Sequence, residues 1–134
     1  MKKINKIAIF WESEAGGGVN SHLRYLLQSK AFLDKQITIF TNSENKGAES
    51  LIKDFDQQKN IKFIFFNSFF VFDRQRIFLE KLIYYFLKPF FLVGAVFKFR
   101  KLLSNYSFDV LLCECGNYGI FRSEQAAIFA AEKL

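Results

Sequence analysis

The sequence has little cysteine, histidine or proline. Its 134 residues include two cysteines, one histidine and one proline. Cys113 and Cys115 are two residues apart in an apolar run, so a strand places them on the same face, where they close no useful disulfide loop. This pattern fits a reducing compartment. One histidine beside two cysteines is a poor zinc set, so we predict no metal site.

Long apolar runs are also missing. The apolar run at the amino end covers only residues 7–11, which is too short for a signal peptide. The longest later run, 82–97, holds Lys88 and Pro89, whereas a membrane-crossing helix needs about 20 uninterrupted apolar residues. We therefore expect a cytoplasmic protein, with peripheral attachment to the inner face of the plasma membrane as a further expectation.

The composition that is present is that of a folded chain with one basic segment. Hydrophobic residues make up 51% and charged residues 24%, which excludes a disordered protein, and the length predicts a single domain over residues 1–134. The net charge is +6, and residues 74–101 carry all of it, with seven basic residues against Glu80. The basic residues are Arg74, Arg76, Lys81, Lys88, Lys98, Arg100 and Lys101.

Apolar segments with strand and helix patterns alternate along the chain. Short β-branched and aromatic runs predict strands at 6–11, 36–41, 61–66 and 109–114. Helical spacing predicts helices at 19–30, 48–57 and 123–134, and one or two helices over 74–104 that Pro89 kinks or breaks. The alternation predicts an α/β fold, a Rossmann-like parallel sheet with helices on both faces.

In such a sheet, ligands bind beyond the carboxyl ends of the strands, where the strand order reverses. The first and fourth strands usually flank that point, so the loops 12–18 and 115–121 are the expected site. The first loop ends in Gly16, Gly17 and Gly18, which either allow close approach of a ligand to the backbone or only make the loop flexible. A dinucleotide fingerprint is excluded because Ser21 stands at its third glycine, and no Gly-Lys-Ser or Gly-Lys-Thr of a P-loop exists.

Both ends of the chain resemble a known family. The run KIAIFWESEAGGGVNSHLRYLLQSKAFLDKQITIFT resembles the opening of family 4 glycosyltransferases, which have the GT-B fold. The run FDVLLCECGNYGIFRSEQAAIFAAEKL is similar to the fourth strand and following helix of that family. The resemblance implies the N-terminal, acceptor-binding half of a GT-B enzyme, ending before a fifth strand.

The resemblance also implies which residues and partners are used. Gly16, Gly17 and Gly18 would lie at the cleft, and Cys115, Gly116 and Asn117 would line the acceptor side. The donor would be a nucleotide-sugar, a substrate with no cofactor beside it, and the acceptor a glycan, lipid-linked in bacterial surface polysaccharide synthesis. A catalytic histidine and the donor-binding glutamates of a hexosyltransferase of this type would lie in a C-terminal part beyond Leu134, so this chain alone is not expected to catalyse transfer.

Two further residues are candidates on their own chemistry. Glu114 alternates with the cysteines in the fourth strand and points to the opposite face, where a charge needs a partner or a cleft. His22 follows the glycine loop on the first helix and is either a site residue or a partly exposed helix residue.

The basic segment has two open interpretations. Its helices either lie in the interface of an anionic membrane, with the seven basic residues meeting headgroups, or cover the sheet and bury their aromatic side chains. Nucleic acid is not an expected partner, because aliphatic residues rather than base-reading polar residues separate the charges. The alternative to half an enzyme is a stand-alone Rossmann-like binding or membrane-docking module that meets a separate catalytic subunit.

Overall fold

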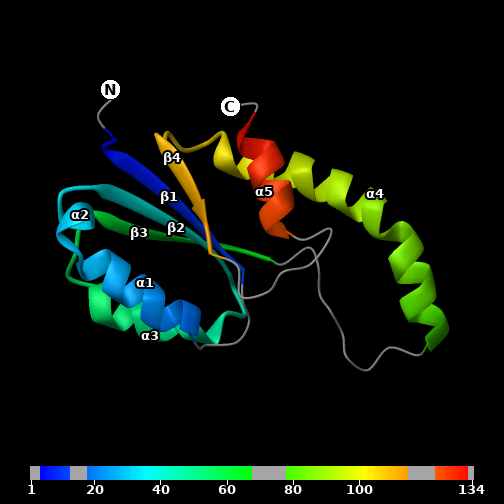
Figure 1. Ribbon diagram of the computed structural model, residues 1–134, viewed down its shortest axis with the longest axis horizontal. Coiled ribbons are helices and arrows are strands. Elements are labelled where there is room, and N and C mark those ends of the chain that lie inside the picture. The colour runs from blue at the N-terminus through cyan, green and yellow to red at the C-terminus, as the bar shows by residue number, and fades with distance from the viewer. Residues whose placement is uncertain (1–3, 13–17, 68–77, 115–122, 133–134) are drawn as a thin grey trace. The chain divides into compact units, whose positions relative to one another are not determined.

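The computed structural model describes residues 4–12, 18–67, 78–114 and 123–132 (Figure 1). These residues form two compact units. The first unit holds four strands and three helices, and the second holds two helices. Each unit is described by itself below.

A parallel sheet is the centre of the first unit. Its strands are β1 (Lys6–Trp11), β2 (Gln36–Asn42), β3 (Ile61–Phe66) and β4 (Val110–Cys113), in the order β3-β2-β1-β4. All three pairings are parallel, and β1 lies between β2 and β4. Side chains on both faces of β1 and β2 are buried, which is why these strands are apolar nearly throughout.

Three helices follow the first two strands, and two of them cover one face of the sheet (Figure 1). They are α1 (Gly18–Gln28), the short α2 (Lys30–Leu33) and α3 (Lys46–Phe55). Leu23 and Leu27 of α1 and Leu51 of α3 pack with Ile9 and Ile39 of the sheet in one buried core. This burial follows the apolar spacing in the sequence and fixes α1 beside the end of β1.

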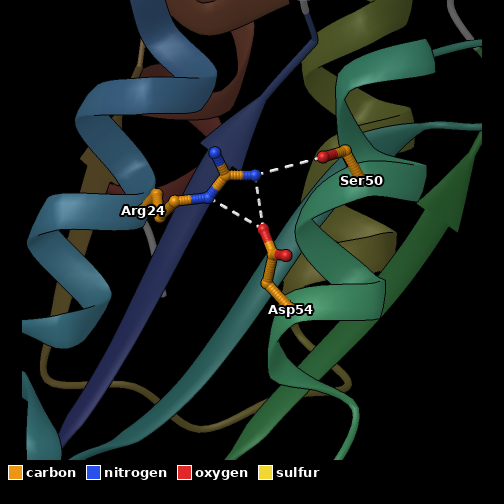
Figure 2. A network of polar contacts seen from close by, with 3 residues as sticks. All are labelled: Arg24, Ser50 and Asp54. Carbon is orange, nitrogen blue, oxygen red and sulfur yellow. Dashed lines mark hydrogen bonds and ion pairs between the residues drawn. The ribbon is translucent and has the colours of Figure 1, made fainter.

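A polar network joins α1 to α3 outside this core. Arg24 donates through Nε to Asp54 Oδ2 at 2.8 Å and through Nη2 to Ser50 Oγ at 3.1 Å (Figure 2). Nη2 also contacts the same Asp54 oxygen. The two charged side chains are 38% and 39% exposed, so water screens their attraction.

Because of that screening, we expect Arg24→Ala to lower the free energy of unfolding by only about 0.5–1 kcal/mol. Urea unfolding of Arg24→Ala, Asp54→Ala and the double variant measures the coupling between the two side chains. A coupling near zero would show that the network contributes nothing to stability.

A carboxylate at the opposite edge of the sheet fixes the start of β1. Asp109 Oδ2 accepts hydrogen bonds from the backbone N–H groups of Asn5 at 2.9 Å and Lys6 at 3.0 Å. Lys6 Nζ also donates to Ser107 Oγ at 2.8 Å. The residue that was predicted to open the fourth strand therefore precedes β4 and ties it to β1.

The second unit consists of α4 (Phe78–Leu103) and α5 (Ser123–Ala131), which pack on each other. Pro89 lies inside α4, and the helix continues through it. The sequence predicted either one helix or two in this segment, and the structure has one helix over Phe78–Leu103. Small residues dominate the buried positions of α5, namely Ala126, Ala127 and Ala130. Alanines allow two helix backbones to approach closely.

The predicted α/β fold, a Rossmann-like parallel sheet flanked by helices, is confirmed. Over the described stretches of the chain, no helix combines the length and apolar character needed to cross a bilayer.

Candidate functional site

The strand order reverses between β1 and β4. From β1 the chain proceeds outward to β2 and β3, and then returns to place β4 on the other side of β1. The carboxyl ends of β1 and β4 therefore meet at the edge where ligands bind in folds of this kind. The backbone N–H of Glu114 donates to the carbonyl of Phe10 at 2.9 Å, which holds Glu114 beside the end of β1.

A histidine and a carboxylate meet at this edge. Ile9 pairs with Leu112, so by alternation Leu112 and Glu114 belong to the face on which α1 packs. His22 lies in the second turn of α1, and its Nδ1 is 3.2 Å from Glu114 Oε2. The side chain of Glu114 is 18% exposed and that of His22 is 59% exposed. The largely buried carboxylate thus has its partner, and the imidazole reaches solvent.

This arrangement suits proton transfer. With a proton on Nδ1, the imidazole donates to Glu114, and Nε2 carries a lone pair. A carboxylate that orients a histidine in this way fixes the tautomer in which the outer nitrogen acts as a base. Among the described residues of this edge, the His22–Glu114 pair is the group placed for proton transfer.

Two buried polar atoms lie next to this pair in the chain. Trp11, the last residue of β1, is fully buried, and its Nε1 has no hydrogen-bond partner among the described residues. Within the same residues, Oδ1 of Asn20 in the first turn of α1 is also buried without a partner. Burying a polar atom without a hydrogen bond costs free energy. This edge of the sheet therefore contains a donor and an acceptor whose hydrogen bonds are not formed within the described residues. Neither atom was predictable from the sequence, because a tryptophan at the end of an apolar strand is indistinguishable from a core residue.

A polar cluster at the end of β2 has a structural role instead. Asn45 donates through Nδ2 to Thr41 Oγ1 at 2.9 Å and accepts through Oδ1 from the N–H of Gly47 at 3.0 Å. Asn45 is thus the N-cap of α3. Asn42 Oδ1 accepts from the N–H of Glu44 at 3.1 Å and closes the preceding turn. These bonds fix the start of α3 over Trp11.

The predicted glycine site is described only at its last member. Gly16 and Gly17 lie outside the described residues, as do Cys115, Gly116 and Asn117. Gly18 is the first residue of α1 and is exposed, and a Cβ added to it would meet none of the described atoms within 4 Å. Packing in the free protein therefore does not require glycine at this position.

We expect Gly18→Ala to leave the fold intact and to raise the free energy of unfolding by up to about 1 kcal/mol, because alanine loses less backbone freedom in a helix. Thermal unfolding measures this change. A lowered midpoint would show that the backbone at Gly18 needs a conformation that only glycine adopts.

The basic residues predicted to contact a membrane are only partly described. Arg74 and Arg76 lie outside the described residues, and for Lys81 and Lys88 the structure describes only the backbone of α4. Lys98, Arg100 and Lys101 lie at the carboxyl end of α4 and are exposed.

Neither a search for metal ligands nor the comparisons with known proteins assign a function to this edge. In the described ranges no group of three histidine, cysteine, aspartate or glutamate side chains is placed to hold a metal ion. Comparison of the chain with protein-family models, with curated proteins and with solved structures gives no match. Function is therefore inferred from the geometry of the β1–β4 edge and from the residues there.

Proposed function

We propose that the chain is the acceptor-binding N-terminal part of a glycosyltransferase. The His22–Glu114 pair at the switch point of a β3-β2-β1-β4 sheet is the observation that carries this proposal. Sugar transfer needs a base near the acceptor hydroxyl and a place where a second domain can present the donor. An exposed imidazole at the carboxyl edge of a Rossmann-like sheet meets both needs.

In this proposal His22 Nε2 takes the proton of the acceptor hydroxyl, which departs from the resemblance to family 4 enzymes, since that resemblance places a catalytic histidine beyond Leu134. The hydroxyl oxygen forms the bond to the anomeric carbon of the donor sugar, and the bond from that carbon to the nucleotide diphosphate breaks. Glu114 holds the imidazole in place and stabilises the positive charge that the ring gains. The donor is a nucleotide-sugar bound by a C-terminal part, so the chain alone does not catalyse transfer.

The acceptor class follows from the resemblance of both ends of the sequence to family 4 glycosyltransferases. That resemblance favours a glycan acceptor, lipid-linked in surface polysaccharide synthesis. Trp11, the last residue of β1, is fully buried at the same edge, so its indole N–H reports on binding there without contacting the saccharide.

The test is a transfer assay on the full-length product of the reading frame that contains these residues. Nucleotide-sugars are supplied with a polyprenyl-diphosphate-linked saccharide, and mass spectrometry detects the extended saccharide. We expect one added hexose with the full-length protein and none with residues 1–134 alone. If the reading frame adds no second Rossmann-like domain and the chain binds a separate catalytic subunit, the stand-alone module is the correct account instead.

A further inference from the structure

Helix α4 has a buried apolar row and an exposed one on roughly opposite sides, with the exposed Leu87 and Phe91 between them. Ala95, Phe99 and Leu103 repeat every four residues and are fully buried. A second row consists of Phe86, Phe90, Val93 and Phe97, which are 76%, 74%, 56% and 67% exposed. We call this second row the outer stripe.

The outer stripe is continuous along the helix. Its members follow one another at intervals of four, three and four residues, so at about 100° per residue they occupy an arc of roughly 60°. The buried row lies on roughly the opposite side of the same helix. The packing of α4 on α5 in the second unit therefore leaves a separate apolar surface about three turns long. Single exposed apolar residues are ordinary, but a contiguous row of three phenylalanines and a valine marks an interaction surface.

The positive charge at the end of the outer stripe indicates what kind of partner the stripe binds. Arg100 and Lys101 continue the spacing of the stripe toward the carboxyl end of α4, and both are exposed. The surrounding segment 74–101 contains seven basic residues and one acidic residue. A second copy of the chain would bring the same positive charge against this surface, whereas an anionic surface neutralises it.

From these observations we propose that the outer stripe docks α4 onto an anionic lipid bilayer. The helix lies in the plane of the interface, with its phenylalanine rings among the acyl chains and its basic residues at the headgroups. Aromatic side chains supply the apolar contribution, and each basic residue near an anionic leaflet strengthens binding roughly fivefold. Docking does not depend on sugar transfer, and it would hold equally for a module without a catalytic half.

Vesicle flotation of the chain tests the proposal. Vesicles of phosphatidylcholine alone are compared with vesicles that also contain phosphatidylglycerol. We expect the wild type to float with the anionic vesicles and not with the neutral ones. We expect the triple variant F86S/F90S/F97S to lose at least about tenfold in affinity with an unchanged unfolding midpoint, because these side chains are exposed.

Two further variants make the test specific. In Y25S/L33S, two exposed apolar residues of the first unit are replaced, and we expect wild-type binding. In R100E/K101E, two exposed charges are reversed, and we expect at least about tenfold weaker binding to anionic vesicles. At high salt the difference in affinity between this variant and the wild type should become smaller, because salt screens the charges.

The proposal is overturned if the wild type does not float with anionic vesicles, or floats equally with neutral ones. It is also overturned if the triple serine variant binds as the wild type does. Light scattering in the absence of lipid measures the oligomeric state of the wild type and of the triple variant. A wild-type dimer that the triple variant converts to a monomer, together with no vesicle binding, would assign the outer stripe to a second copy of the chain.

Discussion

Replacing His22 with alanine in the full-length enzyme lowers kcat for sugar transfer by about 10²–10⁴-fold, the usual contribution of a general base. The acceptor hydroxyl then loses the group that takes its proton, while its binding site stays in place. His22 is 59% exposed, so its removal leaves no cavity in the core. We therefore expect only a small fall in the unfolding midpoint, because Glu114 loses its partner, and a KM for the acceptor within a few-fold of the wild-type value.

Variants of Glu114 separate positioning from catalysis. Glu114→Ala removes the acceptor for Nδ1–H and is expected to lower kcat by about 10–100-fold. Glu114→Gln keeps an oxygen that accepts this hydrogen bond and is expected to restore part of the loss. A purely structural role for Glu114 would lower the unfolding midpoint and leave kcat per folded molecule unchanged.

Tyr25→Ala is the matched control for both positions. Tyr25 lies on α1 one turn after His22 and is also strongly exposed, but no part in the transfer is assigned to it. We expect wild-type kcat and KM. Normal turnover of His22→Ala, with this control also normal, would remove His22 from the mechanism and leave the pair as a surface contact.

Trp11→Ala is expected to be the most destabilising single substitution at the sheet edge. Trp11 is fully buried in the core that β1 and β2 form with α1 and α3. Truncation of a buried tryptophan costs about 3–5 kcal/mol, a large part of the 5–15 kcal/mol that stabilises a typical domain. Calorimetry should show the midpoint lowered by about 10–20 °C. A shift of only a few degrees would mean that the core closes around the missing ring.

Gly47 gives an independent check on the position of the indole. A Cβ at Gly47 would lie 3.0 Å from Cη2 and 3.1 Å from Cζ2 of Trp11. Since the buried ring has little room to move, we expect Gly47→Ala to lower the free energy of unfolding by about 1–2 kcal/mol. In a Trp11→Phe background those two ring carbons are gone, and the cost of Gly47→Ala should fall to what the remaining contact with Asn45 Oδ1 at 3.2 Å contributes. Equal costs in the two backgrounds would contradict the contact.

The strands were predictable because their burial leaves a simple pattern. Residues 7–11 and 63–66 are continuous apolar runs, and the structure gives β1 and β3 the predicted bounds of 6–11 and 61–66. The predicted fourth strand, 109–114, is longer than β4 at both ends. Asp109 there bonds to backbone N–H groups of residues 5 and 6, and Glu114 meets His22. Polar residues at the ends of strands form hydrogen bonds with neighbouring elements, and the local sequence pattern does not show which element each residue contacts.

The candidate site was only half predictable. Alternation alone placed Glu114 on the opposite face from Cys113 and required a partner for its charge. Its partner lies 92 residues away in sequence, and only the position of α1 beside the end of β1 brings the two together. The outer stripe was hidden for a different reason, since α4 is apolar on all sides and its sequence does not distinguish the buried row from the exposed one.

A titration of the chain with acceptor and donor tests the central claim most directly. The sequence holds one tryptophan and one histidine, so the indole N–H of Trp11 and the ring protons of His22 each give one assigned signal in an NMR spectrum. We expect both signals to shift saturably when a detergent-solubilised, polyprenyl-linked saccharide is added, and UDP- and GDP-sugars to show no micromolar binding. Micromolar binding of a nucleotide-sugar, with neither ring responding to the saccharide, would contradict the assignment of this edge to the acceptor.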